Sequence, residues 1–330
     1  MLCEDSWDKD KVKIDEEILK QENEYLKEAF LDSGKEGSFA WKFEKFCHSP
    51  QSYFYFRIGD KLVLGRKYLS DLVLNKNLPG LFCCKISKEM ILGDLYNFRI
   101  SENGVEFLYK IATGKQKEFY FEKLLSDPKI EISYPVAQLL GIHKMEKVTP
   151  KDGWVVDKER AEFLSLGEEV IRDYTLKFLR KTVNINETFK VYDPACSTGK
   201  FLSVIKKTFS NALTVGQELS RQMVEYAKEN GGVDEVYCGD SIRPAVQPES
   251  MDFVFFRFLN GEVVSTDYAK KLFTSLSNTI KKGGYAILFG HTPVLLDAEW
   301  IVAQNFKIVQ LNGHTEDNGF VFQYMVFQRK

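Results

Sequence analysis

Apolar and polar residues alternate with two different periods, and the pattern is most regular in the second half of the chain. From residue 187 onward, short apolar runs are separated by segments with apolar residues three and four positions apart. The runs predict buried strands and the segments predict amphipathic helices. The expected strands are residues 189–196, 212–219, 234–240, 251–260, 285–291, 306–315 and 320–329. The expected helices are residues 199–210, 220–231, 267–284 and 297–305.

Strands that alternate with helices of this length imply right-handed crossovers and a parallel sheet. The last two strands have no helix between them, because only the turn residues 316–319 separate them. We therefore expect residues 187–330 to form an α/β domain. Its fold would be a Rossmann-like, doubly wound, mostly parallel seven-stranded sheet that ends in a C-terminal antiparallel hairpin.

The first 150 residues show a mixed pattern. Residues 8–32 read as a charged helix with one apolar stripe, and residues 53–58 and 61–64 read as two strands around a Gly-Asp turn. Residues 95–101, 104–111 and 117–124 resemble a three-strand meander. We expect an α+β accessory domain over 1–150. A linker and a connecting amphipathic helix would follow over 151–186.

Composition excludes few classes of protein. The formal net charge of the 330 residues is -2, so no global basic field favours a nucleic-acid partner. The charged N-terminal residues do not resemble a signal peptide, and no uncharged apolar run is long enough to span a bilayer. The six cysteines are scattered without zinc-ligand spacing, which fits a reducing compartment. We therefore expect a cytoplasmic protein without a membrane partner.

Three acidic residues follow three successive predicted strands. Asp193 ends the first strand, Glu218 the second, and Asp240 the third. Ligands of open α/β sheets bind at the carboxyl ends of the strands, so these carboxylates should meet in one crevice. Between Asp193 and Gly199 the chain carries small residues before a helix, which lets the backbone approach a ligand closely.

The region from about 187 to 330 resembles the class I S-adenosylmethionine-dependent methyltransferases. The family's first loop reads acid-x-Gly-x-Gly-x-Gly. Here it reads Asp193-Pro-Ala195-Cys-Ser197-Thr-Gly199, so the acid and the last glycine are kept. The segments VGQELS, CGDSI and KKGGYAILFG are similar to the family's later motifs, in the right order. The resemblance implies S-adenosylmethionine as cofactor.

It also implies which residues contact this methyl donor. Asp193, Ala195, Ser197 and Gly199 would lie near its methionine portion, and Glu218 would bind its ribose. The adenine would meet these residues: Asp240, Ser241, Leu219 and Ile242. Arg257 and Phe258, after the fourth strand, would lie near the methionine end and the acceptor pocket.

Two histidines are candidates for the catalytic group that deprotonates or orients the acceptor, with Arg257 nearby. His291 follows the fifth predicted strand directly, and His314 is the second candidate. An alternative is that both histidines bind a metal ion with Asp297 or Glu316, although our working hypothesis includes no metal.

The sequence therefore predicts a methyltransferase that acts on an O, N or C nucleophile of a small molecule, working as a monomer or homodimer. The N-terminal domain would cover the site and select the acceptor. One alternative is a donor-binding protein without catalysis, or one that binds a protein or carrier partner. A nucleic-acid methyltransferase is disfavoured, because residues 256–260 lack the Asn/Asp-Pro-Pro-aromatic motif of the adenine-specific DNA enzymes.

Overall fold

The computed structural model describes residues 34–45, 51–70, 83–135, 169–260, 263–290, 294–315 and 319–330. The chain divides into two compact units. Unit 1 contains residues 1–147, 291–298 and 311–323, and unit 2 contains residues 148–290, 299–310 and 324–330. The helix expected at 8–32 lies outside the described residues.

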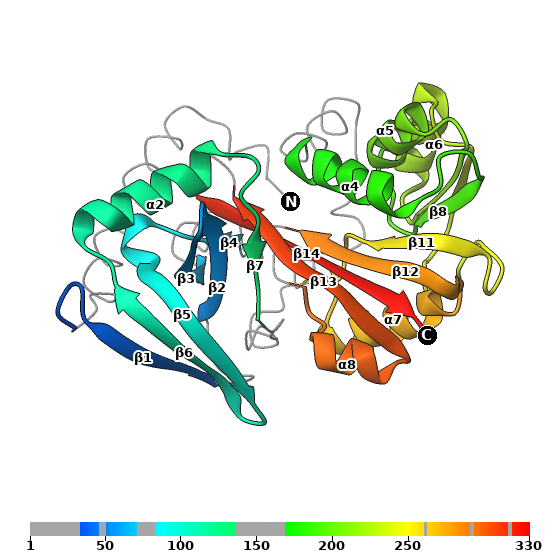
Figure 1. Ribbon diagram of the computed structural model, residues 1–330. Helices are drawn as coiled ribbons and strands as arrows, with labels where there is room; N and C mark the ends of the chain where they lie inside the picture. The colour runs from blue at the N-terminus through cyan, green and yellow to red at the C-terminus, as the bar shows by residue number, and fades with distance from the viewer. Residues whose placement is uncertain are drawn as a thin grey trace, which may run out of the picture. The chain divides into compact units, whose positions relative to one another are not determined.

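The sheet of unit 2 is built largely from parallel strands. These are β8 (Phe189–Asp193), β9 (Ala212–Glu218), β10 (Glu235–Cys238), β11 (Met251–Phe256) and β12 (Ile280–Gly290), followed by β13 (Phe306–Thr315) and β14 (Phe320–Arg329). Neighbouring strands follow the order β10-β9-β8-β11-β12-β14-β13. The pairs from β10 to β12 are parallel. Strands β13 and β14 run in opposite directions (Figure 1) and also contribute residues to unit 1.

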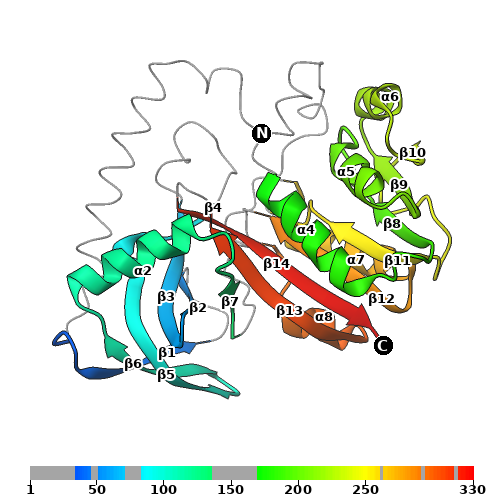
Figure 2. The same ribbon diagram turned by 45° about the horizontal axis from the view of Figure 1, so that its top comes forward.

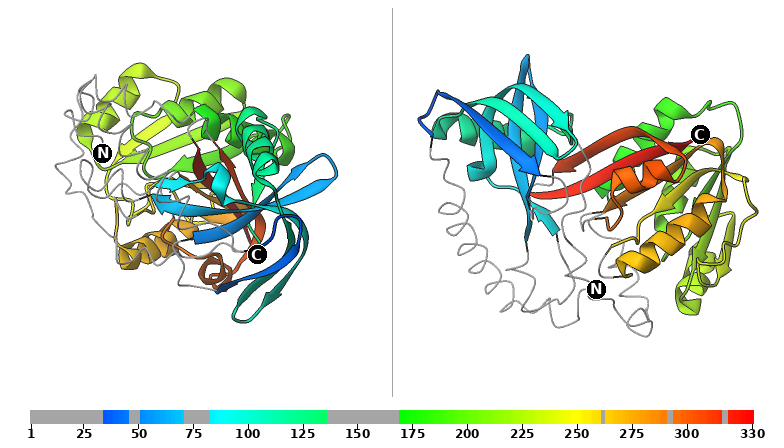
Figure 3. Two further views of the ribbon diagram at one scale, coloured as in Figure 1. Left: turned by 90° about the vertical axis from the view of Figure 1, so that its left-hand side faces the viewer. Right: turned by 90° about the horizontal axis from the view of Figure 1, so that it is seen from below.

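Helices cover both faces of this sheet. They are α4 (Glu169–Thr182), α5 (Lys200–Thr208), α6 (Arg221–Asn230), α7 (Thr266–Ser277) and α8 (Ala298–Ala303). The first three lie on one face and the last two on the other (Figures 1 and 3). An α/β fold of the doubly wound kind results, as the sequence predicted. The connecting helix expected within residues 151–186 lies partly outside the described residues, and α4 is the part that the structure describes.

Strand β8 is where the order of the strands reverses. Its neighbours are β9 on one side and β11 on the other, so successive strands are added in opposite directions from this point. The helix after β8 and the helices after β11 therefore leave on opposite faces of the sheet. Such a switch point opens a crevice at the carboxyl ends of the strands, which is the usual ligand site of this architecture.

Unit 1 is an antiparallel sheet packed against one helix. Its strands are β1 (Phe39–Lys45), β2 (Gln51–Ile58), β3 (Lys61–Ser70), β4 (Cys83–Lys85), β5 (Ile91–Ser101), β6 (Gly104–Ile111) and β7 (Ile132–Ser133). They follow the order β1-β6-β5-β3-β2-β7-β13, and β4 pairs with β3 and β14. Helix α2 (Gly114–Ser126) lies along the sheet (Figure 2), and a short 3-10 helix, η2 (Lys88–Met90), precedes β5.

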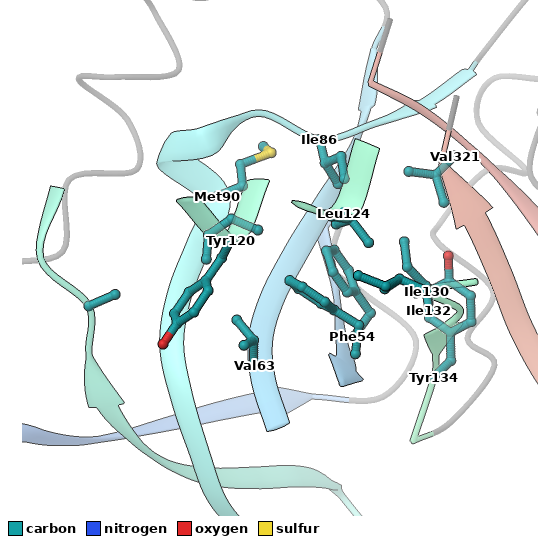
Figure 4. Close-up of a cluster of buried hydrophobic side chains, with 13 residues drawn as sticks. Phe54, Val63, Ile86, Met90, Tyr120, Leu124, Ile130, Ile132, Tyr134 and Val321 are labelled. Carbon is teal, nitrogen blue, oxygen red and sulfur yellow. The ribbon is translucent and has the colours of Figure 1, made fainter. Parts of the chain in front are cut away.

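The core of unit 1 joins α2 to the sheet. Tyr120 and Leu124 of α2 pack with Phe54, Val63 and other buried side chains (Figure 4). Val321, which belongs to β14 near the C-terminus, is fully buried in the same cluster. Unit 1 is thus larger than the N-terminal region 1–150 alone, because its core includes this C-terminal residue.

The prediction of a third strand in the meander is wrong, because residues 117–124 lie inside helix α2. The three consecutive aromatic residues 119–121 imitate the composition of a strand. A capping box decides the outcome: Thr113 Oγ1 accepts from the Gln116 N–H at 3.3 Å, and Gln116 Oε1 accepts from the Thr113 N–H at 2.9 Å. Tyr120 and Leu124, four residues apart, then share the buried face.

The helix expected at 267–284 is also too long. Helix α7 ends at Ser277, and strand β12 begins at Ile280, before the glycine pair. Met251 pairs with Ile280 but Phe253 pairs with Tyr285, so the segment between bulges out of the sheet. The described residues contain fourteen strands in all. Strands β8 to β14 lie within residues 187–330, and the other seven precede them.

Candidate active site

Three carboxylates stand at the carboxyl ends of neighbouring strands in unit 2. Asp193 is the last residue of β8 and Glu218 is the last residue of β9, while Asp240 follows β10 by two residues. Strand β9 pairs with both β8 and β10, in parallel. The fold therefore brings the three predicted acids to the same edge of one sheet.

Asp193 is fully buried and anchors the first loop. Its Oδ1 accepts from the Ala195 N–H at 3.1 Å, and its Oδ2 forms an ion pair with Nη1 of Arg257 at 3.2 Å. The guanidinium of Arg257 also lies over the ring of Phe201, with Cζ 4.9 Å from the ring centroid. Arg257, which follows β11, is thus fixed between the first loop and helix α5.

Two residues of the first loop adopt positive φ angles. Ser197 has a φ of 51° and Gly199 has a φ of 74°. Gly199 precedes α5, and a Cβ built on it would lie 3.2 Å from Cβ of Ala227. Glycine is needed there, whereas Ser197 takes the left-handed conformation with a side chain, in the position where the family's pattern has glycine.

Glu218 ties the first loop to the second. Its Oε2 accepts from the Ser197 N–H and its Oε1 accepts from the Ser220 N–H, both at 3.0 Å. Burial raises the pKa of Glu218, the nearby charge of Asp193 raises it further, and the backbone N–H groups oppose both effects. A ligand that brings hydroxyl donors and positive charge would favour the ionised carboxylate.

The loop after β10 is held by several side chains. Asp240 Oδ1 accepts from the Ile242 N–H at 3.1 Å, and Ser241 Oγ donates to the carbonyl oxygen of Pro194 in the first loop. Tyr268 of α7 also donates to the Asp240 carboxylate. The first loop, which follows β8, and the loop after β10 are therefore connected directly.

The predicted apolar contacts differ in their exposure. Leu219, next to the partly buried Glu218, is 43% exposed. Ile242 is partly buried. Phe258 is only 8% exposed and belongs to the interior. An exposed leucine at a ligand crevice fits an aromatic ring stacked on it.

Of the two predicted histidines, His291 lies outside the described residues. His314, in unit 1, is 6% exposed and stacks on Phe322. Its Nδ1 lies 2.7 Å from the carbonyl oxygen of Thr315, and its Nε2 lies 3.2 Å from that of Pro128. Both ring nitrogens are engaged by backbone oxygens, so this geometry indicates a structural role rather than that of a base.

For the metal alternative, Asp297 is partly buried, and Glu316 lies outside the described residues together with His291. In the part of the chain that the structure describes, no group of three or more His, Cys, Asp or Glu side chains has the arrangement of a metal site. No described helix is long and apolar enough to cross a membrane.

Sequence reasoning missed the residues that brace the loops. Gln217 Oε1 accepts from the phenol of Tyr192 and from the Ala245 N–H at 2.9 Å, and its Nε2 donates to the Arg243 carbonyl oxygen at 3.2 Å. The signal was a polar residue inside an otherwise apolar strand. Buried polar groups need partners, so Gln217 could have been expected to hold a loop.

Comparisons with known proteins agree with this geometry. Residues 192–288 match a family described as a methyltransferase domain. The chain is also 34% identical over 284 residues to isonocardicin synthase of Nocardia uniformis subsp. tsuyamanensis, covering 85% of this chain and 92% of that protein. The chain belongs to the class I S-adenosylmethionine-dependent methyltransferase superfamily. It is accordingly a methyltransferase whose cofactor is S-adenosylmethionine.

Solved structures match this methyltransferase in part. One is the PH0226 protein from Pyrococcus horikoshii OT3, at 15% identity and a TM-score of 0.43, over 55% of this chain and 100% of that one. Another is magnesium protoporphyrin IX methyltransferase from Synechocystis PCC 6803 with bound S-adenosylmethionine. It is 16% identical with a TM-score of 0.41, over 53% of this chain and 86% of that chain.

The residues present suit this cofactor. S-adenosylmethionine carries ribose hydroxyls and an adenine amine as hydrogen-bond donors, a positive sulfonium, and a flat apolar ring. The carboxylates of Glu218 and Asp240 supply acceptors and negative charge, while the fully buried Asp193 holds the first loop in place. Leu219 offers an exposed apolar surface. The side chains at these strand ends, where this fold binds its ligands, thus have the chemistry that the groups of the cofactor require.

Proposed function

We propose that this methyltransferase transfers the methyl group to an O, N or C nucleophile of a small natural product. The observation that carries the proposal is the extent of the match to isonocardicin synthase. That match covers 85% of the chain, so it includes much of the region before residue 187 as well as the donor-binding part. Shared N-terminal sequence supports a shared kind of acceptor, because this region would supply the acceptor's contacts.

In this proposal each strand end binds one part of the donor. Glu218 would accept from the ribose hydroxyls, and Asp240 with Ser241 would bind the adenine. Leu219 and Ile242 would enclose the adenine ring. The first loop, with Ala195, Ser197 and Gly199 after Asp193, would bind the methionine portion. The hydrogen bonds from Ser197 N–H to Glu218 and from Ser241 to Pro194 already hold these loops together, so little reorganisation is needed.

The donor supplies an activated methyl group on a sulfonium, and the protein's part is to position the acceptor in line with it. Arg257, fixed between Asp193 and Phe201, would mark the methionine end of the site. We propose His291 as the base that takes a proton from the acceptor. His314 is not needed for this role, because backbone oxygens engage both of its nitrogens.

The N-terminal region would act as an accessory domain that selects the acceptor, and the protein would work in the cytoplasm as a monomer or homodimer. A nucleic-acid acceptor is disfavoured by the net charge of -2 and by Phe-Arg-Phe-Leu-Asn at residues 256–260, in place of a Pro-Pro motif.

Titration calorimetry tests the donor site, and a screen of small acceptors tests the reaction. We expect binding of S-adenosylmethionine and S-adenosylhomocysteine, and an acceptor-dependent release of S-adenosylhomocysteine with a methylated product by mass spectrometry. A sulfonium has three carbon substituents, so the leaving co-product must be identified. Release of methylthioadenosine would refute methyl transfer, and binding without turnover across the screen would favour a non-catalytic donor-binding protein.

A further inference from the structure

Helix α7 is attached to the loop after β10 by two side-chain hydrogen bonds. Near its start, the phenol of Tyr268 lies 3.2 Å from Oδ1 and 3.3 Å from Oδ2 of Asp240. Near its end, Ser275 Oγ donates to the Ile242 carbonyl oxygen at 2.8 Å. Only the first of these bonds reaches the carboxylate. The second holds the backbone of the same loop.

Tyr268 stands on a well-anchored part of the helix. Ser265 caps α7, and its Oγ accepts from the N–H of Tyr268 itself at 3.3 Å. One turn further on, Leu272 and Phe273 are buried beneath α7. The N-cap and the buried side chains of α7 therefore hold the backbone of Tyr268 in place, so its phenol reaches the loop from a fixed position.

The phenol of Tyr268 contacts both oxygens of the Asp240 carboxylate. Oδ1 accepts from the Ile242 N–H at 3.1 Å, which holds one oxygen, while the phenol lies almost equally far from both oxygens. An ionised carboxylate has about four acceptor directions, so further donors can still be accommodated. Burial and the charge of Asp240 raise the pKa of Tyr268, so the phenol remains a donor at neutral pH.

We propose that Tyr268 is the positioning residue for adenine recognition: it orients the Asp240 carboxylate to accept a hydrogen bond from the donor's exocyclic amine. This inference rests on the donor contacts of the proposed function. Tyr268 would act only through Asp240, and it would favour adenine over a base that carries an oxygen at the same position. A carboxylate accepts from an amine but repels a carbonyl oxygen.

Calorimetry with two ligands tests the proposal. S-adenosylhomocysteine carries the amine, and S-inosylhomocysteine carries an oxygen in its place. The wild type should bind the adenine ligand at least about tenfold more tightly, as expected for a hydrogen bond to a charged group. In Tyr268→Phe the adenine ligand should lose about threefold to tenfold in affinity. The affinity of Tyr268→Phe for the inosine ligand should stay unchanged, so the variant should discriminate less between the adenine and inosine ligands.

Ser275→Ala is the matched control, because it removes the other bond between α7 and this loop. It should lower thermal stability as Tyr268→Phe does, yet keep the wild-type discrimination. The proposal is overturned if Tyr268→Phe keeps full discrimination, or if Ser275→Ala loses as much. A wild type that binds both ligands equally would refute Asp240 as the adenine contact. A wild type that binds neither would refute the proposed function itself.

Discussion

Ser197 is the residue of the first loop whose replacement should stabilise the protein. Its φ of 51° lies in the left-handed region, where a residue with a Cβ is disfavoured by about 1–2 kcal/mol. Ser197→Gly removes this strain but gives the unfolded chain more freedom, which costs about 0.4–1 kcal/mol. The hydroxyl's contact with Sδ of Met223, at 3.5 Å, is a weak hydrogen bond. We expect a net stabilisation of about 0.5–1 kcal/mol, from the difference between these effects.

Thermal unfolding followed by circular dichroism measures this effect. The melting temperature of Ser197→Gly should rise by about 1–4 °C. Two variants serve as controls. Ser197→Ala keeps the Cβ and should show no gain. Ser203→Gly places glycine inside helix α5, where it should cost about 0.5 kcal/mol relative to serine.

Strain at Ser197 would be refuted if Ser197→Gly melted no higher than Ser197→Ala, or lowered the melting temperature as Ser203→Gly does. Donor affinity gives a second check. Only the backbone N–H of Ser197 reaches Glu218, and glycine retains it. Binding of S-adenosylhomocysteine should therefore change by less than about twofold, which corresponds to under 0.5 kcal/mol.

Three further predictions concern other parts of the chain. Glu218→Ala should weaken donor binding by about 1.5–3 kcal/mol, the value of a hydrogen bond to a charged group, and calorimetry that finds no loss would remove Glu218 from the site. Burial raises the pKa of Glu44 to about 8, so between about pH 4.5 and 8 it keeps a proton that the unfolded chain has released. Stability should fall with rising pH across this window, and Glu44→Gln should flatten that slope in urea titrations; an unchanged slope would contradict the assignment. Thr113→Ala should destabilise unit 1 by about 1 kcal/mol through loss of the capping box, whereas a strand at this position would be insensitive to the change.

The strand–helix alternation after residue 187 could be predicted because short apolar runs alternate there with segments of helical spacing. FKIVQLNGHT and FVFQYMVFQR coincide with β13 and β14 to the residue. The end of α7 could not be predicted in this way. The sequence TIKKGG is typical of the last turn of a helix, but Ile280 already pairs with Met251 in the sheet. The pairing of strands from distant parts of the chain is not visible in a local pattern.

The acids of the candidate site were predictable in the same way, since each closes an apolar run. The groups that hold them were harder to find. Tyr268 lies on a helix that begins after residue 265, and nothing in its local sequence indicates that it reaches Asp240. His314 shows the opposite case: this histidine near the end of a predicted strand was a catalytic candidate, but its neighbours in space are backbone oxygens. Such contacts depend on tertiary packing that sequence spacing does not reveal.

The position of Val321 in the core of unit 1 has a consequence for how the protein is made. Phe54 and Val63 are translated long before Val321, the side chain that completes their cluster. This cluster therefore stays incomplete until residue 321 has been translated. A fragment that stops at residue 150 would expose this cluster. Expression trials that aim at an isolated N-terminal domain should graft the strand around Val321 onto it.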